Sequence, residues 1–144
     1  MKEVGILNRD ISDILTRAGH QDEICICDAG FAMPTEVKSV DISLKDNCPK
    51  LIDVLEEIKK YFSIEKIIIA DVTKTHNPTM FKNIVDTFKN KVELEIISHE
   101  EFKVRSKRVK GIIRTGEFTA YSNVILVSGA KRERWFIEKD SNIE

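Results

Sequence analysis

The segment Lys66-Ile67-Ile68-Ile69-Ala70-Asp71-Val72 is the clearest core strand in this sequence. Its uninterrupted apolar run is rich in the β-branched residue isoleucine, which favours a strand that is buried on both faces. Such strands occur in parallel sheets covered by helices, whereas a sheet with one solvated face alternates apolar and polar residues. The segment therefore predicts an α/β fold with a parallel sheet.

Helix-like and strand-like segments alternate on both sides of this strand. Further strands are predicted over residues 23–27, 37–42, 92–97, 111–114 and 123–127. Helices are predicted to begin after Asn8, at Pro49, at Pro78 and after Ser98. This alternation, without repeats or a linker, predicts a single compact α/β domain over residues 1–130, with a largely parallel sheet flanked by helices. Residues 131–144 are predicted to be a charged C-terminal extension, either a short helix or a frayed tail.

Composition narrows the classes of function. The 144 residues carry 23 Lys and Arg against 24 Asp and Glu, so charge gives no reason to expect binding to nucleic acid or to a membrane. No signal peptide is visible, and the longest apolar run is too short to span a bilayer. Cys25 and Cys27 alternate within a predicted strand, which indicates buried thiols of a reduced, cytoplasmic protein.

Polar residues follow several of the predicted strands. Asp28 follows the strand 23–27, His99 follows the strand 92–97, and Thr115-Gly116-Glu117 follows the strand 111–114. Ligands of open α/β sheets usually bind at the carboxyl ends of the strands. These residues therefore predict a polar site at that edge of the sheet.

Two of the three histidines lie at predicted helix ends. His20 follows the first helix, whose carboxyl end favours a protonated ring, and His99 lies at a helix amino end, which favours a neutral ring. Such a pair could act as proton donor and acceptor, although two exposed capping histidines would have the same spacing. His76, which precedes Asn77-Pro78, is better explained as a turn residue.

Tyr121 and Asn123 are separated by one residue, so in an extended segment both side chains lie on the same side. A phenol and an amide together offer donors and acceptors to sugar hydroxyls. An edge tyrosine beside a turn asparagine would give the same pattern. Phosphate-binding loops, nucleophile elbows and zinc-protease motifs are missing from the sequence, so these residues alone predict only an α/β domain with a histidine-containing polar site.

Five sequence blocks, taken in order, resemble the family of D-ribose pyranases and L-fucose mutarotases. They are Gly5-Ile6-Leu7-Asn8, Ala18-Gly19-His20, Asp28-Ala29-Gly30, Ser98-His99-Glu100-Glu101-Phe102-Lys103 and the run from Ile113 to Asn123. The blocks span nearly the whole chain up to about Gly129, and the last two are closer to the ribose branch.

The resemblance implies an isomerase that interconverts the β-pyranose and β-furanose forms of D-ribose without metal, nucleotide or any other cofactor. It assigns His20 as the proton donor. It assigns sugar binding to Asp28, His99, Tyr121 and Asn123. Glu117 is a further candidate, either in the site or as a brace for its loop. The family assembles as a homo-oligomer, typically a decamer, with sites near subunit contacts.

Two alternatives remain open at this point. One is a mutarotase for L-fucose or another sugar, and the other is a non-catalytic sugar-binding protein. The presence of His20 favours an enzyme, because binding alone rarely needs a titrating group at that place.

Overall fold

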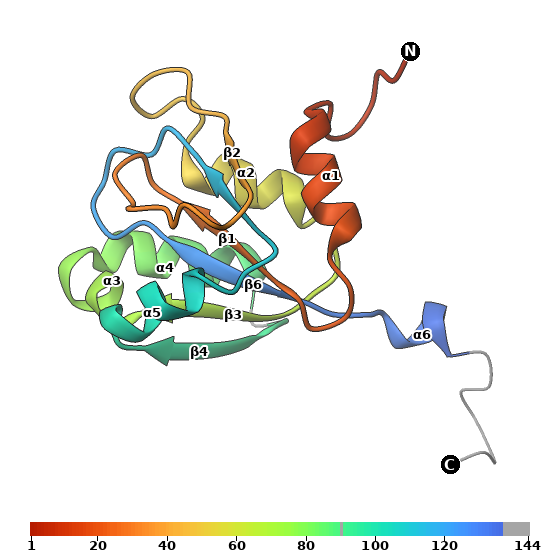
Figure 1. Ribbon diagram of the computed structural model, residues 1–144. Helices are drawn as coiled ribbons and strands as arrows, with labels where there is room; N and C mark the ends of the chain where they lie inside the picture. Colours follow the sequence, from red (N-terminus) through yellow and green to blue (C-terminus); the bar gives the residue numbers. More distant parts are fainter. Residues whose placement is uncertain (90, 137–144) are drawn as a thin grey trace.

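A six-stranded sheet forms the centre of the molecule (Figure 1). The computed structural model describes residues 1–89 and 91–136. In spatial order the strands are β2 (Ser39–Asp41), β5 (Gly111–Arg114), β1 (Glu23–Cys27), β6 (Val124–Ser128), β3 (Ile64–Ala70) and β4 (Glu93–Ile97). The predicted strands are thus all present, with ends that differ by a few residues. The α/β fold inferred from the sequence is confirmed.

The sheet is parallel except for β6, which runs antiparallel to both β1 and β3. The sequence analysis did not foresee this reversal. Its physical reason is the short connection over residues 115–123, since a parallel neighbour needs a crossover of about a dozen residues or more. The connection therefore leaves β5 and enters β6 at the same edge of the sheet, where β1 and β3 end.

Helices cover both faces of the sheet (Figure 1). One face packs against α1 (Arg9–Arg17), α2 (Leu51–Ile58) and α4 (Pro78–Phe88), and the other against α5 (His99–Ser106). Asn8 caps α1 as predicted, because its Oδ1 accepts from the backbone nitrogens of Asp10 and Ile11, both at 2.9 Å. Pro78 begins α4 and Ser98 caps α5, also as predicted.

Strand β1 shows how the core is divided. Ile24 and Ile26 pack on the α1, α2 and α4 side, whereas Cys25 and Cys27 pack on the α5 side, and all four are fully buried. This alternation follows from the two-residue period of a strand. Burial raises the pKa of the Cys27 thiol to about 12, so the thiol stays neutral. Both cysteines are therefore packing residues, as the sequence predicted.

The segment after β3 differs from the prediction. The strand ends at Ala70, and α3 (Asp71–His76) follows directly, so His76 is the last residue of a helix and not a turn residue. Thr73 is 1% exposed, and its hydroxyl donates to the carbonyl of Tyr121 at 2.6 Å. The residues of α3 are mostly β-branched or polar and therefore poor helix formers. The hydrogen bond from Thr73 to Tyr121 offsets this weak local preference for a helix.

The chain after β6 includes α6 (Arg132–Trp135), which stands away from the sheet (Figure 1). The sequence analysis allowed either a short helix or a frayed tail for residues 131–144, and a short helix is present over Arg132–Trp135. Residues 137–144 lie outside the described residues. The division of the chain at residues 130 and 131 stays a prediction. Within the described ranges, no helix combines the length and the apolar character that crossing a membrane requires.

Candidate active site

A pocket of about 360 Å³ lies at the carboxyl edge of the sheet. It is lined by Asp28, Ala29, Gly30, Arg114, Glu117, Phe118, Thr119 and Ala120. These residues are Arg114, the last residue of β5, and members of the segments that follow β1 and β5, so the parallel pairing of the two strands brings them together. This is the edge at which the sequence placed a polar site.

Asp28 ties the pocket to the end of β1. The residue is 7% exposed, and its Oδ1 and Oδ2 accept from the backbone nitrogens of Gly30 at 3.0 Å and Ser122 at 3.1 Å. Burial raises the pKa of this carboxyl group, and the N–H donors partly oppose that shift by stabilising the charged form. Asp28 therefore holds the loop before β6 in place while it contributes to the pocket lining.

Asn123 faces Asp28 from the start of β6. Its Oδ1 accepts from the Asp28 backbone nitrogen at 2.9 Å, and the residue is 8% exposed. In the described part of the chain, its side-chain nitrogen donates to no other group. The amide therefore uses its acceptor oxygen to hold the start of β6 against the end of β1, and its donor has no partner among the described residues.

The expectation that Tyr121 and Asn123 share one side of an extended segment is wrong. Tyr121 has a φ of 59°, in the left-handed region, because residues 119–121 form a turn. Two side chains from the neighbouring helices hold this turn. The Thr73 hydroxyl binds the carbonyl of Tyr121, and Asn77 Nδ2 donates to the carbonyl of Ala120 at 2.8 Å. Tertiary hydrogen bonds therefore decide where the phenol points.

The Tyr121 ring lies near two histidines. Its centroid is 5.6 Å from that of His99, edge to face at 87°, and 5.7 Å from that of His76, tilted at 59°. His99 is the first residue of α5, as predicted, and His76 ends α3. The sequence analysis interpreted His76 as a turn residue, since no local pattern shows that residue 76 meets residue 121. The three rings form an aromatic and polar cluster at the carboxyl edge.

Glu117 braces its loop. It is 5% exposed, and its Oε1 accepts from the backbone nitrogen of Leu51 at 3.0 Å while its Oε2 accepts from the Thr119 hydroxyl at 2.8 Å. Leu51 is the first residue of α2, whose N-cap residue Lys50 makes no side-chain cap bond. Glu117 supplies that cap from a distant part of the chain, so both of its oxygens have structural partners.

Gly116 allows this arrangement. A β-carbon at this position would lie 2.6 Å from the carbonyl oxygens of Lys45 and Cys48. Since these are backbone atoms, they cannot move aside cheaply, and only glycine fits. The preceding Thr115 donates through its hydroxyl to the carbonyl of Cys27 at 2.8 Å. The Thr115-Gly116-Glu117 motif is therefore the junction that joins β1, β5 and α2 below the pocket.

We predict that Glu117→Ala lowers the free energy of unfolding by about 2 kcal/mol, because it leaves the Leu51 N–H without its buried acceptor. Urea unfolding followed by circular dichroism measures this change. Glu117→Gln is the matched control, since its amide oxygen can still accept from the Leu51 nitrogen. We expect this variant to keep most of the stability that Glu117→Ala loses. Equal destabilisation by both substitutions would contradict a capping role.

His20 lies at the opposite edge of the sheet. It follows α1 and precedes β1, whereas Asp28 follows β1. A strand rises roughly 3.3 Å per residue, which puts about 13 Å between the two ends of β1. The predicted pairing of His20 with His99 as donor and acceptor is therefore not formed within one copy of the chain. The physical reason is that the strand β1 separates the two edges.

At its own edge, the His20 ring lies beside the start of β3. Its Nδ1 is 3.6 Å from Oε1 of Glu65, and the two side chains are 60% and 40% exposed. The described residues place no other candidate site residue at this edge. His20 is thus displayed at the surface.

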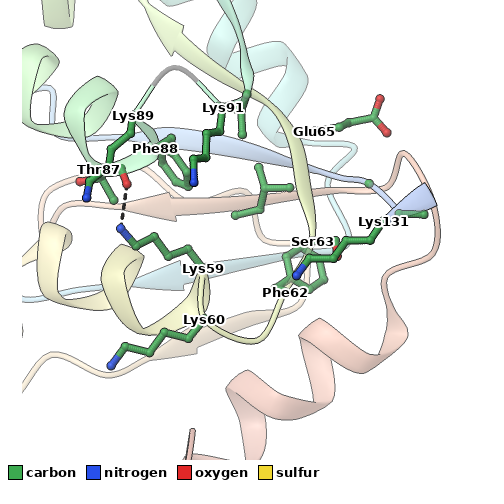
Figure 2. Close-up of a pocket in the computed structure, with 14 residues that line it drawn as sticks. Lys59, Lys60, Phe62, Ser63, Glu65, Thr87, Phe88, Lys89, Lys91 and Lys131 are labelled. Carbon is green, nitrogen blue, oxygen red and sulfur yellow. Dashed lines mark hydrogen bonds between the residues drawn. The ribbon is translucent and has the colours of Figure 1, made fainter. Parts of the chain in front are cut away.

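A larger pocket, of about 450 Å³, opens at this amino edge (Figure 2). Its lining includes Glu65 and the lysines Lys59, Lys60, Lys89, Lys91 and Lys131. Four of these lysines follow the last residues of α2 and α4, where ammonium groups complement the free carbonyls of a helix end. Lys59, for example, donates to the carbonyl of Thr87 at 2.8 Å. The position of these four lysines is therefore explained by the helix ends that they follow.

Comparison with known proteins gives a consistent result over most of the chain. Residues 1–131 match the model of the RbsD / FucU transport protein family. The D-ribose pyranase of Lactobacillus gasseri is 45% identical over 129 residues, which cover 90% of this chain and 98% of that protein. The D-ribose pyranase of Staphylococcus haemolyticus is 41% identical with the same coverage.

Two solved structures are similar. Bacillus subtilis RbsD complexed with D-ribose superposes with a TM-score of 0.86 at 41% identity, over 91% of this chain and 99% of that one. The fucose mutarotase from Streptococcus pneumoniae in complex with L-fucose has a TM-score of 0.69 at 23% identity, over 87% and 94% of the two chains, and shares the fold. With a family model that matches nearly the whole described chain, and relatives above 40% identity, this protein belongs to the RbsD / FucU family.

Proposed function

We propose that this chain acts as a D-ribose pyranase, an isomerase that interconverts the β-pyranose and β-furanose forms of D-ribose. One observation carries the proposal: the chain is 41% identical, over 91% of its length, to an RbsD structure complexed with D-ribose. Relatives at comparable identity bear the name D-ribose pyranase. The last two sequence blocks predicted the ribose branch of the family, and the names of these relatives agree with that prediction.

The reaction needs a group that can both give and take a proton. Opening the pyranose ring requires a proton on the ring oxygen while the anomeric hydroxyl loses one. The free aldehyde then rotates and is attacked by a different hydroxyl, with the proton transfers reversed. An imidazole can work in both directions near neutral pH, and we assign the proton donation to His20.

In this proposal each sugar site is shared between two copies of the chain. One copy contributes its carboxyl edge with Asp28, and its neighbour contributes His20. The separation of about 13 Å along β1 supports the sharing, because a monosaccharide cannot touch both edges of one copy. We propose a homo-oligomer, a decamer as is typical of the family, in which unlike surfaces of neighbouring copies meet around a ring. We place this assembly in the cytoplasm.

The carboxyl edge then binds the sugar hydroxyls. Asp28 and Asn123 lie in hydrogen-bond contact with each other, so they present an acceptor and a free amide donor side by side. Tyr121 and His99, whose ring centroids lie 5.6 Å apart, add ring faces and polar atoms at the same edge of the sheet. Such a set of donors and acceptors suits a polyol.

Exchange NMR on D-ribose, with and without catalytic amounts of protein, tests the proposal. We expect faster exchange between the β-pyranose and β-furanose signals when the protein is present. If the protein leaves ribose unaffected and accelerates anomer exchange of L-fucose, it is a mutarotase of the other branch. If neither sugar responds, the chain is at most a sugar-binding protein and the proposed activity is wrong.

A further inference from the structure

We propose that Glu65 is a positioning residue for His20 and that the two form a carboxylate–imidazole pair at the amino edge of the sheet. This inference rests on the proposed function, in which His20 donates the proton. The pair has Nδ1 of His20 facing Oε1 of Glu65 at 3.6 Å. The other ring nitrogen, Nε2, is then left for the sugar in the neighbouring copy.

A tight turn presents His20. The backbone nitrogen of Asp22 donates to the carbonyl of Gly19 at 3.1 Å, and Asp22 Oδ2 accepts from the Gly19 nitrogen at 2.7 Å. Gln21, next to His20, has a φ of 69°, a left-handed conformation that is uncommon for a residue other than glycine. Backbone strain of this kind often accompanies a functional side chain, because the surrounding structure must hold it.

Backbone contacts with β6 hold the turn. The nitrogen of Gln21 donates to the carbonyl of Ser128, and the nitrogen of Ser128 donates to the carbonyl of Asp22, both at 2.8 Å. The position of His20 is thereby tied to the end of β6.

The same end of β6 also fixes Glu65. The nitrogen of Gly129 donates to the carbonyl of Ser63 at 2.9 Å. A β-carbon at Gly129 would lie 2.8 Å from Cβ of Glu65, so glycine is needed for this close approach. Ser128 therefore binds the His20 turn, and the next residue, Gly129, binds the carbonyl of Ser63 and packs closely against Glu65.

The other charged groups nearby have different roles. Arg17, at the end of α1, pairs with Asp13, and Lys110, before β5, lies 3.7 Å from the Asp22 carboxylate. Lys131, two residues after Gly129, lines the amino-edge pocket together with Glu65 (Figure 2). Asp22 is the other acid of the turn, and its carboxylate binds the Gly19 N–H. Glu65 is thus the carboxylate that faces the His20 ring.

The chemistry of the pair follows from its geometry. A carboxylate beside Nδ1 favours the tautomer that carries its proton on Nδ1, and it stabilises the imidazolium that must form. At 3.6 Å the contact is electrostatic and not yet a hydrogen bond. When a neighbouring copy excludes water from this edge, the attraction strengthens, since it is no longer screened by a high dielectric. Contacts of this type commonly tighten only in the complex with substrate.

The first test is the kinetics of Glu65→Gln in the full chain. We expect kcat for ribose ring exchange to fall roughly 10-fold while KM changes less than about 2-fold, because Glu65 acts through the proton donor and does not bind the sugar. Glu65→Asp, which keeps the charge on a shorter side chain, is expected to restore part of the loss. Glu93→Gln is the matched control, an exposed charge change at the same edge of the neighbouring strand β4.

The second test reads the ring of His20 directly. Solid-state ¹⁵N NMR of protein labelled at its three histidines distinguishes the two neutral tautomers. We expect the His20 signals to show a proton on Nδ1 in the unmodified protein, and this preference to weaken in Glu65→Gln, because at 3.6 Å the attraction depends on the charge that the substitution removes. Wild-type tautomer and wild-type kcat in Glu65→Gln would overturn the inference. Absence of ring exchange in the unmodified protein would instead overturn the proposed function, and the tautomer measurement would still report the contact.

Discussion

We expect the substitution His20→Ala to abolish the accelerated ring exchange of ribose. General acid–base catalysis by one side chain contributes about 10²- to 10⁴-fold, so the rate should fall by at least about 10²-fold, toward the uncatalysed rate. Exchange NMR with equal amounts of the two proteins measures the difference. The effect is large because the reaction otherwise depends on water to protonate the ring oxygen.

The His20→Ala result needs evidence that the fold is intact. The side chain is 60% exposed and its described polar contact is with Glu65, so the free energy of unfolding should change by no more than about 0.5 kcal/mol. Urea unfolding checks this expectation. Ribose binding, followed by saturation-transfer NMR, should persist, because the carboxyl-edge residues are untouched. Exchange that stays at the wild-type rate would refute the assignment of His20 as proton donor.

Mixed oligomers should regain activity that each of two variants lacks. His20→Ala removes the proton donor, and His99→Ala removes a ring next to Tyr121 at the other edge. A shared site can form between one copy of each variant. The His99→Ala copy then contributes its intact His20, and the His20→Ala copy contributes its intact His99. If equal amounts of the two chains assemble at random, about one quarter of the sites contain both histidines.

Coexpression of the two variants with different affinity tags, followed by tandem purification, yields the mixed oligomers. Exchange NMR should then show roughly one quarter of the wild-type activity. A mixture of separately purified variants, without subunit exchange, is the control and should stay inactive. Coassembled protein that is no more active than the sum of its parts would show that His20 does not work across the contact between copies.

Much of the architecture could be predicted from local patterns. The apolar run at residues 66–72 gave a buried strand, and Asn8, Pro78 and Ser98 marked helix starts that the structure confirms. Placing Asp28 and His99 at strand ends also needed only local information. A strand or a helix cap depends on side chains within a few positions, so its signal is present in a short window of sequence.

The arrangement of the candidate site could not be predicted in the same way. The direction of β6, the left-handed backbone of Tyr121 and the use of Glu117 as a cap for α2 all depend on partners far along the chain. For Glu117 this partner is Leu51, and for the Tyr121 carbonyl it is Thr73. No pattern near these residues indicates such contacts.

The sequence by itself determined which segments become strands and helices, and it brought Asp28 and His99 to the edge where parallel strands end. Only the tertiary structure decided that His20 stands at the opposite edge beside Glu65, and that β1 lies between His20 and Asp28. The physical reason is that the spacing of apolar residues along one segment indicates only which residues of that segment are buried. Which side chains meet depends on strand order and direction, and these are set by packing among segments that are distant in sequence.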